Sequence, residues 1–366
     1  MIFRSISQGG LNRCTRWSVP VLVLALASAT PQQEEEKEAL AASARNFKFQ
    51  TFFYPQSAET RNQFTTPVSI NDAGVVVGNI HRTGKGCPDQ DCGLEGFIYE
   101  NGKFTLLNGP QYKGRFTNPV AINNRGQILV VQDPHIGGVP PQFFIYDMAH
   151  RTYQPVGPFV QIPGAPNKIR LAQITGFNDK GQFVGNYRFR NKQYGGYGTL
   201  PVGEAGSTTV PAETGNFTPI ECPQGRSTNA TSVNNRGQVT GACDGSPRPP
   251  VRSGFLFSNG TMTLFDFPDA TLTRGNAIND AGAIAGEYTL KPRHPGQWPP
   301  TGFAYDGSQF TPVALHSAGP NGLLSVANGI NNKGQITGME GNANQNNGFV
   351  ATPTGANPLH LPAGGR

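Results

Sequence analysis

A nine-residue pattern occurs six times in this chain and constrains its fold more than any other feature. Each copy has an apolar residue, Asn, then Asn or Asp, any residue, Gly, and an apolar stretch that usually ends in a second Gly. The copies begin at Ile70, Ile122, Phe177, Val233, Ile278 and Ile330. Asn, Asp and Gly accept the backbone angles of tight turns, so each copy predicts a hairpin. In the last copy we expect strands at 325–330 and 335–339 around a turn at 331–334.

The copies start 45 to 56 residues apart, a period that fits four-stranded propeller blades better than solenoid coils. Each period also contains a second hairpin, such as the run around Asn259-Gly260, because Asn-Gly between β-prone segments is a strong hairpin signal. These features predict an all-β, six-bladed β-propeller at 47–354, in which the first strand pairs beside the last. An open β array is the alternative. A calcium loop at the Asn-Asp pair lacks the alternating carboxylates that such a site needs.

Composition agrees with a fold made of short strands and turns. The chain of 366 residues contains 47 Gly and 31 Pro, and only 14% of its residues are charged. Disorder is the other outcome for a chain rich in Gly and Pro. The regular spacing of Val, Ile and Phe argues against it, and we expect one large repeat domain.

The first 29 residues have the features of a secretory signal peptide. Arg4, Arg13 and Arg16 precede an apolar core at 19–27, which ends in the small residues of a cleavage site. An uncleaved anchor is the alternative, although the apolar stretch is short for a membrane span. We expect a flexible acidic linker at 30–46, a disordered tail at 355–366, and a secreted, periplasmic or cell-surface location.

Loss of the leader removes three Arg and no acidic residue, which lowers the net charge from +6 to +3. The high isoelectric point therefore does not indicate a nucleic-acid partner.

Cysteine usage agrees with export. Cys14 belongs to the leader, and four cysteines remain: Cys87, Cys92, Cys222 and Cys243. An even number in an exported chain favours disulfides. We expect a bond from Cys87 to Cys92 within one loop, and a bond from Cys222 to Cys243 at one end of the fourth unit. A metal site is the alternative, but it would need a closing set of four ligands.

The repeated run Ile-Asn-x-x-Gly-x-Ile-x-Gly, followed later by a small residue and Phe, resembles the bacterial probable extracellular repeat of the HAF family. The resemblance covers about 47–352. The family's His-Ala-Phe signature is altered here to triplets that end in Phe97, Phe255, Phe303 and Phe349. The resemblance implies an exported, β-rich protein, and it implies no activity for any named residue.

The predicted strand directions place the short turns at one end of the fold and the long, variable loops at the other. Variable loops on a rigid scaffold are where binding residues tend to lie, so we place any site at the long-loop end. Sixteen Lys and Arg and nine Asp and Glu fall there, a net +7 that can attract an anionic partner. A solvated rim that keeps the protein soluble is the plainer explanation.

The loop 287–301 is the richest single candidate for a ligand site. It holds Tyr288, Lys291, Arg293, His294 and Trp298 among prolines, and an aromatic plate with basic neighbours suits a sugar or an anionic glycan. The alternative is that Trp298 only packs the loop against the fold. Four loop histidines come from different units, and nothing in their spacing demands a metal site: His81, His135, His294 and His316.

No nucleophile motif, phosphate-binding Gly loop or zinc motif occurs in the sequence. We therefore expect a monomeric, non-catalytic binding or scaffold module for a surface glycan or protein partner, with no cofactor, metal or nucleic acid. The alternative is a propeller-type hydrolase or lyase that acts on polysaccharide, for which two acids such as Glu287 and Asp133 should converge. A purely structural surface repeat is a third possibility.

Overall fold

The computed structural model describes residues 43, 46–56, 61–85, 91–110, 116–133, 140–162, 164–165, 167–190, 192–245, 251–290, 300–315, 324–341 and 346–355. The predicted signal peptide, most of the linker and nearly all of the tail lie outside these residues, as does the predicted Cys87–Cys92 bond.

The strands pair into antiparallel meanders of four, each of which we call a blade and number along the chain. Blade 1 is β2 (Arg61–Ile70), β3 (Val76–Thr83), β4 (Asp91–Glu100) and β5 (Lys103–Leu107). Blade 2 is β6 (Thr117–Ile122), β7 (Gln127–Gln132), β8 (Gln142–Asp147) and β9 (Thr152–Val156). Blade 3 is β12 (Gln173–Phe177), β13 (Gln182–Phe189), β14 (Lys192–Thr199) and β15 (Gly215–Ile220), with the short strands β10 (Phe159–Gln161) and β11 (Ile169–Arg170) beside β15.

Blade 4 is β16 (Ser227–Val233), β17 (Val239–Asp244), β18 (Arg252–Ser258) and β19 (Thr261–Phe265), preceded by the 3-10 turn η2 (Pro223–Gly225). Blade 5 is β20 (Ala270–Ile278), β21 (Ile284–Leu290), β22 (Thr301–Tyr305) and β23 (Phe310–Val313). Blade 6 is β24 (Leu324–Ile330), β25 (Ile336–Gly341) and β26 (Asn346–Pro353), completed by β1 (Phe47–Phe52).

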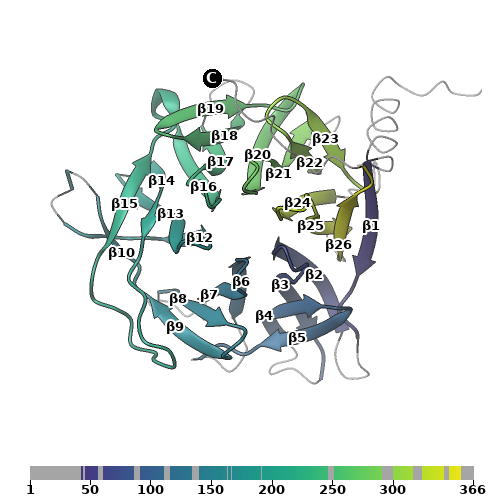
Figure 1. Ribbon diagram of the computed structural model, residues 1–366, viewed down its shortest axis with the longest axis horizontal. Helices are drawn as coiled ribbons and strands as arrows, with labels where there is room; N and C mark the ends of the chain where they lie inside the picture. Colours follow the sequence, from purple (N-terminus) through teal and green to yellow (C-terminus); the bar gives the residue numbers. More distant parts are fainter. Residues whose placement is uncertain are drawn as a thin grey trace, which may run out of the picture.

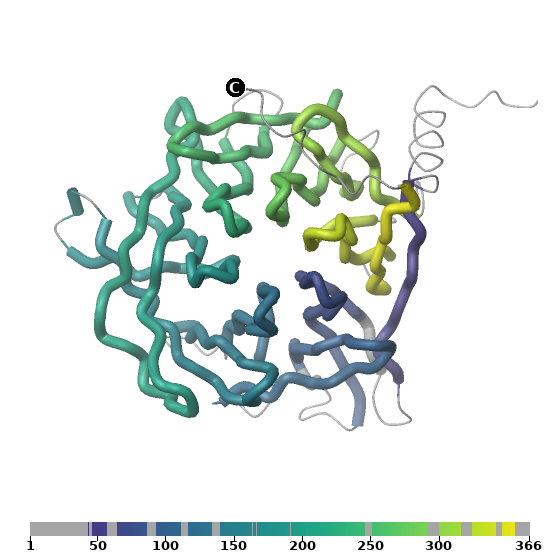
Figure 2. The backbone as a smooth tube through the Cα atoms, viewed as in Figure 1, coloured from purple at the N-terminus to yellow at the C-terminus, as the bar shows by residue number. Residues whose placement is uncertain are grey.

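The blades stand around a central axis, with the first strand of each blade innermost (Figure 1). The innermost strands contact one another in chain order, and β24 of blade 6 contacts β2 of blade 1. The N-terminal strand β1 pairs antiparallel with the C-terminal strand β26, in register from Phe47 opposite Pro353 to Phe52 opposite Gly348. Figure 2 shows these two ends of the chain side by side. The predicted pairing of the first strand with the last is confirmed.

The blade boundaries fall one strand later than the period of the sequence suggests. The strand after each Asn-Gly type hairpin pairs with the strand before it, as β5 does with β4. That strand therefore forms the outer edge of the blade already built. The reason is that a two-residue hairpin fixes its two strands as neighbours, whereas the longer connection that follows leads back to the axis.

The Asn of each repeat builds its turn with its own side chain. Asn331 Oδ1 accepts hydrogen bonds from the backbone N–H groups of Lys333 and Gln335 at 3.0 and 2.9 Å. Gly334 adopts a φ of 73°, which glycine tolerates because it has no Cβ. The predicted hairpin is thus confirmed. Asn331 Nδ2 also donates to the carbonyl of Asn71 in blade 1 at 2.9 Å, so the turn residue joins two blades as well.

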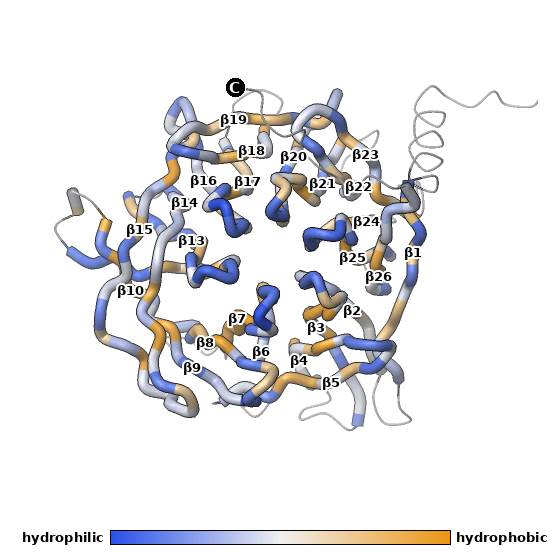
Figure 3. The backbone as a smooth tube through the Cα atoms, in the orientation of Figure 1, coloured by the Kyte–Doolittle hydropathy of each residue, from blue (hydrophilic) through white to orange (hydrophobic). Residues whose placement is uncertain are grey.

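The residue after this Asn extends the link into a closed ring of hydrogen bonds. Its side-chain oxygen accepts from the backbone N–H of the equivalent residue in the preceding blade, at 2.7 to 3.0 Å. The six residues, which alternate acid and amide, are Asp72, Asn124, Asp179, Asn235, Asp280 and Asn332. Figure 3 shows hydrophilic turns gathered around the axis. Hairpin chemistry in the sequence does not reveal this second role.

The second Gly of the repeat makes room for an aromatic ring from the next strand. A Cβ on Gly338 would lie 2.7 Å from the ring of Phe349 and 1.9 Å from the carbonyl oxygen of Val326. Gly338 and Phe349 stand opposite each other in the sheet, and Phe349 is fully buried. The repeat therefore encodes a packing contact between strands in addition to a turn.

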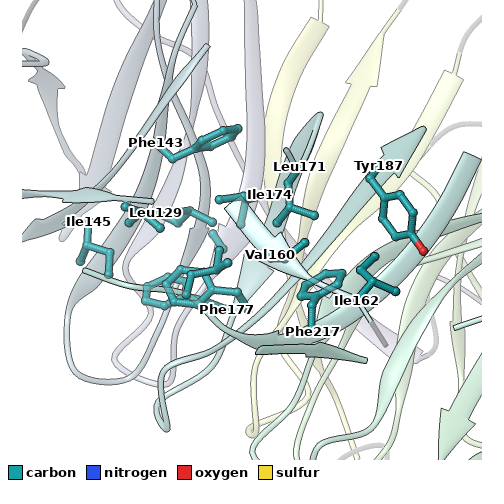
Figure 4. Packing of buried hydrophobic residues seen from close by; sticks show 14 residues of the cluster. Leu129, Phe143, Ile145, Val160, Ile162, Leu171, Ile174, Phe177, Tyr187 and Phe217 are labelled. Atoms are coloured by element: carbon teal, nitrogen blue, oxygen red, sulfur yellow. The ribbon is translucent and has the colours of Figure 1, made fainter. Parts of the chain in front are cut away.

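The hydrophobic core consists of several clusters that lie largely between neighbouring blades. One cluster joins Leu129 and Phe143 of blade 2 to Ile174 and Phe183 of blade 3, and its packing is shown in Figure 4. Stacking neighbours bury the faces that a single four-stranded sheet would leave in water.

Two further observations concern the predicted covalent and terminal features. Cys222 and Cys243 form a disulfide, with Cα atoms 5.7 Å apart, which confirms that predicted bond. Ser43, assigned from the sequence to a flexible linker, is fully buried, and its hydroxyl accepts a hydrogen bond from Ala314 N at 3.0 Å. The packed part of the chain therefore begins before residue 47, because this hydroxyl satisfies a buried backbone donor.

Candidate functional site

The structure describes the side chains of only part of the predicted basic rim. Six of its sixteen cations have no described side chain: Arg61, Lys113, Arg115, Arg248, Lys291 and Arg293. In the predicted loop site, His294 and Trp298 also lie outside the described residues. Tyr288 is described and is 6% exposed. Its ring stacks on Phe267 with centroids 3.6 Å apart, so this tyrosine packs within blade 5 and has little surface to offer a ligand.

A basic, aromatic hairpin projects from blade 3. Strands β13 and β14 stay paired to the tip, where Phe189 is opposite Lys192. Phe189 is 47% exposed, and the guanidinium of Arg190 lies 5.1 Å from the centre of its ring. The Lys192 ammonium lies 4.6 Å from the ring of Tyr194, which stacks on Tyr187. We call residues 187–194 the basic hairpin.

The basic hairpin combines a hydrophobic surface with exposed charge. Arg188 and Arg190 are exposed and no acid lies between 187 and 194. Burial raises the pKa of the Tyr187 hydroxyl to about 12, so that ring is neutral over the physiological range. Aromatic faces beside cations suit a partner that is both anionic and ring-bearing.

A cavity of about 170 Å³ lies where blades 4 and 5 meet, and we call it the arginine cavity. Its lining residues are Arg252 of blade 4 and Leu272, Arg274, Glu287, Thr289 and Pro300 of blade 5. Side chains two residues apart on a strand share a face, which brings Leu272 and Arg274 of β20 together with Glu287 and Thr289 of β21. These residues are opposite each other in the sheet, Leu272 with Thr289 and Arg274 with Glu287.

Each arginine of the cavity faces an acid on the neighbouring strand. Arg252 Nε lies 2.5 Å from Asp244 Oδ1. Arg274 Nη1 is 3.9 Å from Glu287 Oε1, too far for a hydrogen bond. Burial lowers the pKa of Arg274, and this effect exceeds the opposing effect of Glu287. Arg274 Nε is buried and has no hydrogen-bond partner among the described residues.

The axis holds a second cavity, of about 100 Å³, lined by the ends of the innermost strands and their turns. The ring of alternating acids and amides satisfies itself, since Asn235 Nδ2 donates to Asp179 at 2.7 Å and to Asp280 at 3.0 Å. Within the described part of the chain, no group of three or more His, Cys, Asp or Glu side chains could hold a metal ion.

The acid pair named for a glycosidase does not meet in this fold. Asp133 follows β7 of blade 2 and Glu287 lies in β21 of blade 5, and two blades separate them on either side of the ring. Figure 1 places β7 and β21 on opposite sides of the axis. Glu287 instead has Arg274 as its neighbour. Of the four loop histidines, only His81 is described, and it stacks on Phe64.

Sequence reasoning identified Arg252, Arg274 and Glu287 as residues of the long-loop end, but it did not place them in one cavity. It also missed Leu272, Thr289 and Pro300. The alternation of residues along β20 and β21 could have indicated that four of these side chains share one face. The approach of Arg252 depends on how blade 4 packs on blade 5, and no local pattern carries that information.

No family model matches the chain, and no curated protein matches it. Among solved structures, the chain is similar to the β-propeller domain of the Trilobed protease from Pyrococcus furiosus, at 10% identity over 82% of this chain and 84% of that chain, with a TM-score of 0.43. It is also similar to a Trypanosoma rangeli sialidase in complex with sialic acid, at 9% identity over 84% of this chain and 59% of that chain, with a TM-score of 0.45. A lectin from Aleuria aurantia matches at 12% identity over 83% of this chain and 100% of that chain, with a TM-score of 0.40.

These likenesses concern the fold alone: the chain is all-β and is similar to β-propeller domains. None of the helices in the described residues is long and apolar enough to cross a membrane.

Proposed function

We propose that this protein is an exported, non-catalytic binding module of the HAF type, built on a six-bladed β-propeller, that binds an anionic surface glycan or a cell-surface protein through its long-loop end. The closed ring of turn residues and the pairing of β1 with β26 support the six-bladed ring. The Cys222–Cys243 disulfide and the leader-like residues 1–29 support export.

The observation that carries the binding function is the basic hairpin. Phe189 is the most exposed of the large hydrophobic side chains described in this chain, and it lies among Arg188, Arg190 and Lys192. An exposed ring flanked by cations offers apolar and positively charged surface together to one partner. A polymer of acidic sugars has the matching chemistry, because its ring faces stack on aromatic side chains and its charges pair with the cations.

Chromatography on immobilised glycans tests this function. The purified protein should be retained on a polyuronate such as polygalacturonate and should pass through neutral dextran. The triple variant Arg188→Gln, Arg190→Gln and Lys192→Gln should elute at about half the salt concentration, because three attractive charges are gone.

A matched control removes the same charge from the opposite end of the molecule. Lys180, Arg236 and Lys333 are exposed at the third position of their turns, and changing all three to Gln should leave elution unchanged. Equal loss of retention in both triple variants would show simple ion exchange by the net charge. No retention of the natural protein on any acidic glycan or cell-envelope extract would refute the function.

The alternative is a propeller-type enzyme that cleaves polysaccharide, and one observation favours it. Glu287 lines the same cavity as two arginines, so an acid stands where a bound acidic sugar would lie. Incubation with the retained polymer decides between the two functions: new reducing ends or unsaturated products that disappear in Glu287→Gln would establish the enzyme, and an unchanged polymer would establish the binding module.

A further inference from the structure

The arginine cavity contains an electrostatic mismatch that a ligand would correct. Arg252 has a close acidic partner in Asp244, at 2.5 Å. Arg274 has none at hydrogen-bond distance, since Glu287 remains 3.9 Å away. The Arg274 side chain is 32% exposed, so part of its guanidinium remains accessible to a ligand. The folded protein therefore holds a guanidinium that an anion in the cavity would stabilise.

The unpaired edge of Arg274 defines the shape of that anion. A guanidinium offers five N–H donors in a plane, and adjacent donors bind the two oxygens of a carboxylate as a fork. Nε is buried, whereas Nη1 stays 3.9 Å from Glu287, so the Nη1–Nη2 edge is the accessible one. A ligand carboxylate can therefore approach the Nη1–Nη2 edge, because Glu287 lies beyond hydrogen-bond distance of it. Arg252, on the adjoining strand of blade 4, adds positive charge to the same cavity.

The remaining lining residues indicate what the carboxylate is attached to. A cavity of about 170 Å³ is close to the size of about 150 Å³ that accommodates one six-membered ring. Leu272 and Pro300 provide apolar surface, whereas the Thr289 hydroxyl and the Glu287 carboxylate can bond to ligand hydroxyl groups. One ring, one carboxylate and several hydroxyls are the features of an acidic monosaccharide unit.

We propose that the arginine cavity binds one uronic acid unit, with its carboxylate on the Nη1–Nη2 edge of Arg274 and its hydroxyls toward Glu287 and Thr289. The proposal deepens the proposed function, because it names the sugar class that the long-loop end recognises. Pro300 directly precedes β22 (Thr301–Tyr305), and the cavity is separate in sequence from the basic hairpin of blade 3. The two regions can therefore be tested independently.

Saturation-transfer NMR with free sugars measures this binding directly. Galacturonate or glucuronate should bind with a Kd on the order of 1 mM, the affinity expected for a ligand of this size at ordinary efficiency. Galactose and glucose, which lack the carboxylate, should bind at least about tenfold more weakly. Inorganic sulfate is the third probe, because it carries charge without a sugar ring.

Two variants test the role of Arg274. Arg274→Gln should weaken uronate binding about tenfold to a hundredfold, and Arg274→Lys should restore only part of it, since an ammonium keeps the charge but loses the planar fork. Arg236→Gln, at an exposed turn on the opposite end, is the matched control and should bind as the natural protein does. If Arg274→Gln does not fold, the contrast among uronate, neutral sugar and sulfate in the natural protein still decides the proposal.

The outcomes separate this proposal from the function it rests on. Uronate binding that is equal in Arg274→Gln, or equal for uronate and neutral sugar, overturns the proposal. Binding of sulfate that is tighter than binding of uronate shows an oxyanion site without sugar recognition and also overturns it. If the polymer column still retains the protein through the basic hairpin in any of these cases, the binding function stands and only the cavity assignment fails.

Discussion

Arg82 with Glu95 on blade 1 and Arg274 with Glu287 on blade 5 are the same chemical pair in two different packings. In blade 1, Arg82 Nε and Nη2 donate to both carboxylate oxygens of Glu95, at 2.6 and 2.8 Å. In blade 5, the nearest approach of the pair is 3.9 Å, and a cavity opens beside it. The first pair has satisfied its charges internally, whereas the second keeps a donor unused.

The difference separates a structural ion pair from a candidate ligand site. The hydrogen bond to Glu95 is the main reason that the pKa of Arg82 is raised, whereas burial is the main reason that the pKa of Arg274 is lowered. Charge alone therefore does not make a residue at the long-loop end a binding residue. The useful criterion is whether the fold has already given it a partner.

The largest expected effect is on stability. Arg82→Gln should lower the free energy of unfolding by about 2 kcal/mol, because it leaves the buried Glu95 without its cation. Arg274→Gln should change it by less than about 1 kcal/mol, since its partner is distant. Urea unfolding of both variants measures the difference, and equal destabilisation by the two substitutions would contradict the distinction drawn between the pairs.

A smaller effect is expected on ligand affinity when the acids are neutralised. Glu287→Gln should tighten uronate binding about threefold, because it removes a like charge from the cavity while keeping a hydrogen-bond acceptor. Glu95→Gln should leave that affinity unchanged. Titration by NMR compares the two, and weaker binding in Glu287→Gln would contradict the expected repulsion between the two carboxylates.

The smallest effect is expected in the response to salt. Raising NaCl from about 50 to about 500 mM should reduce uronate affinity in the arginine cavity by no more than about threefold, because charges in partly buried sites are screened weakly. Retention through the exposed basic hairpin should fall much more over the same range. If both fell equally, the cavity would be acting as an open surface.

Local sequence patterns predicted the turns and much of the strand pairing. Asn331 and Gly334 encode a turn that the structure confirms, and the partner of β1 followed from counting strands per period. Local patterns did not predict the second partner of a residue that has two. Asn332 reads as a turn residue, yet its backbone N–H and amide bond to Asp72 of the neighbouring blade at 2.7 and 2.9 Å. A pattern nine residues long cannot predict a contact between residues 260 positions apart along the chain.

The candidate site shows the same division. The sequence assigned Tyr288 to a loop, but Tyr288 lies in strand β21 and its ring stacks on Phe267. It also paired Glu287 with Asp133, because both are acids of long-loop segments, and the ring places them on opposite sides of the axis. The composition of a loop shows which residues have suitable chemistry. It does not show which of them the fold has already buried or paired.

The sequence by itself determined the turns, the four strands of each repeat and the Cys222–Cys243 bond, because these depend on backbone preferences of adjacent residues and on a short chain connection. Only the tertiary structure decided that Arg82 forms a bidentate pair with Glu95 and that Arg274 faces a cavity. That outcome depends on how two twisted sheets pack against each other, and a shift of about an ångström between their strands separates a hydrogen bond from an open donor.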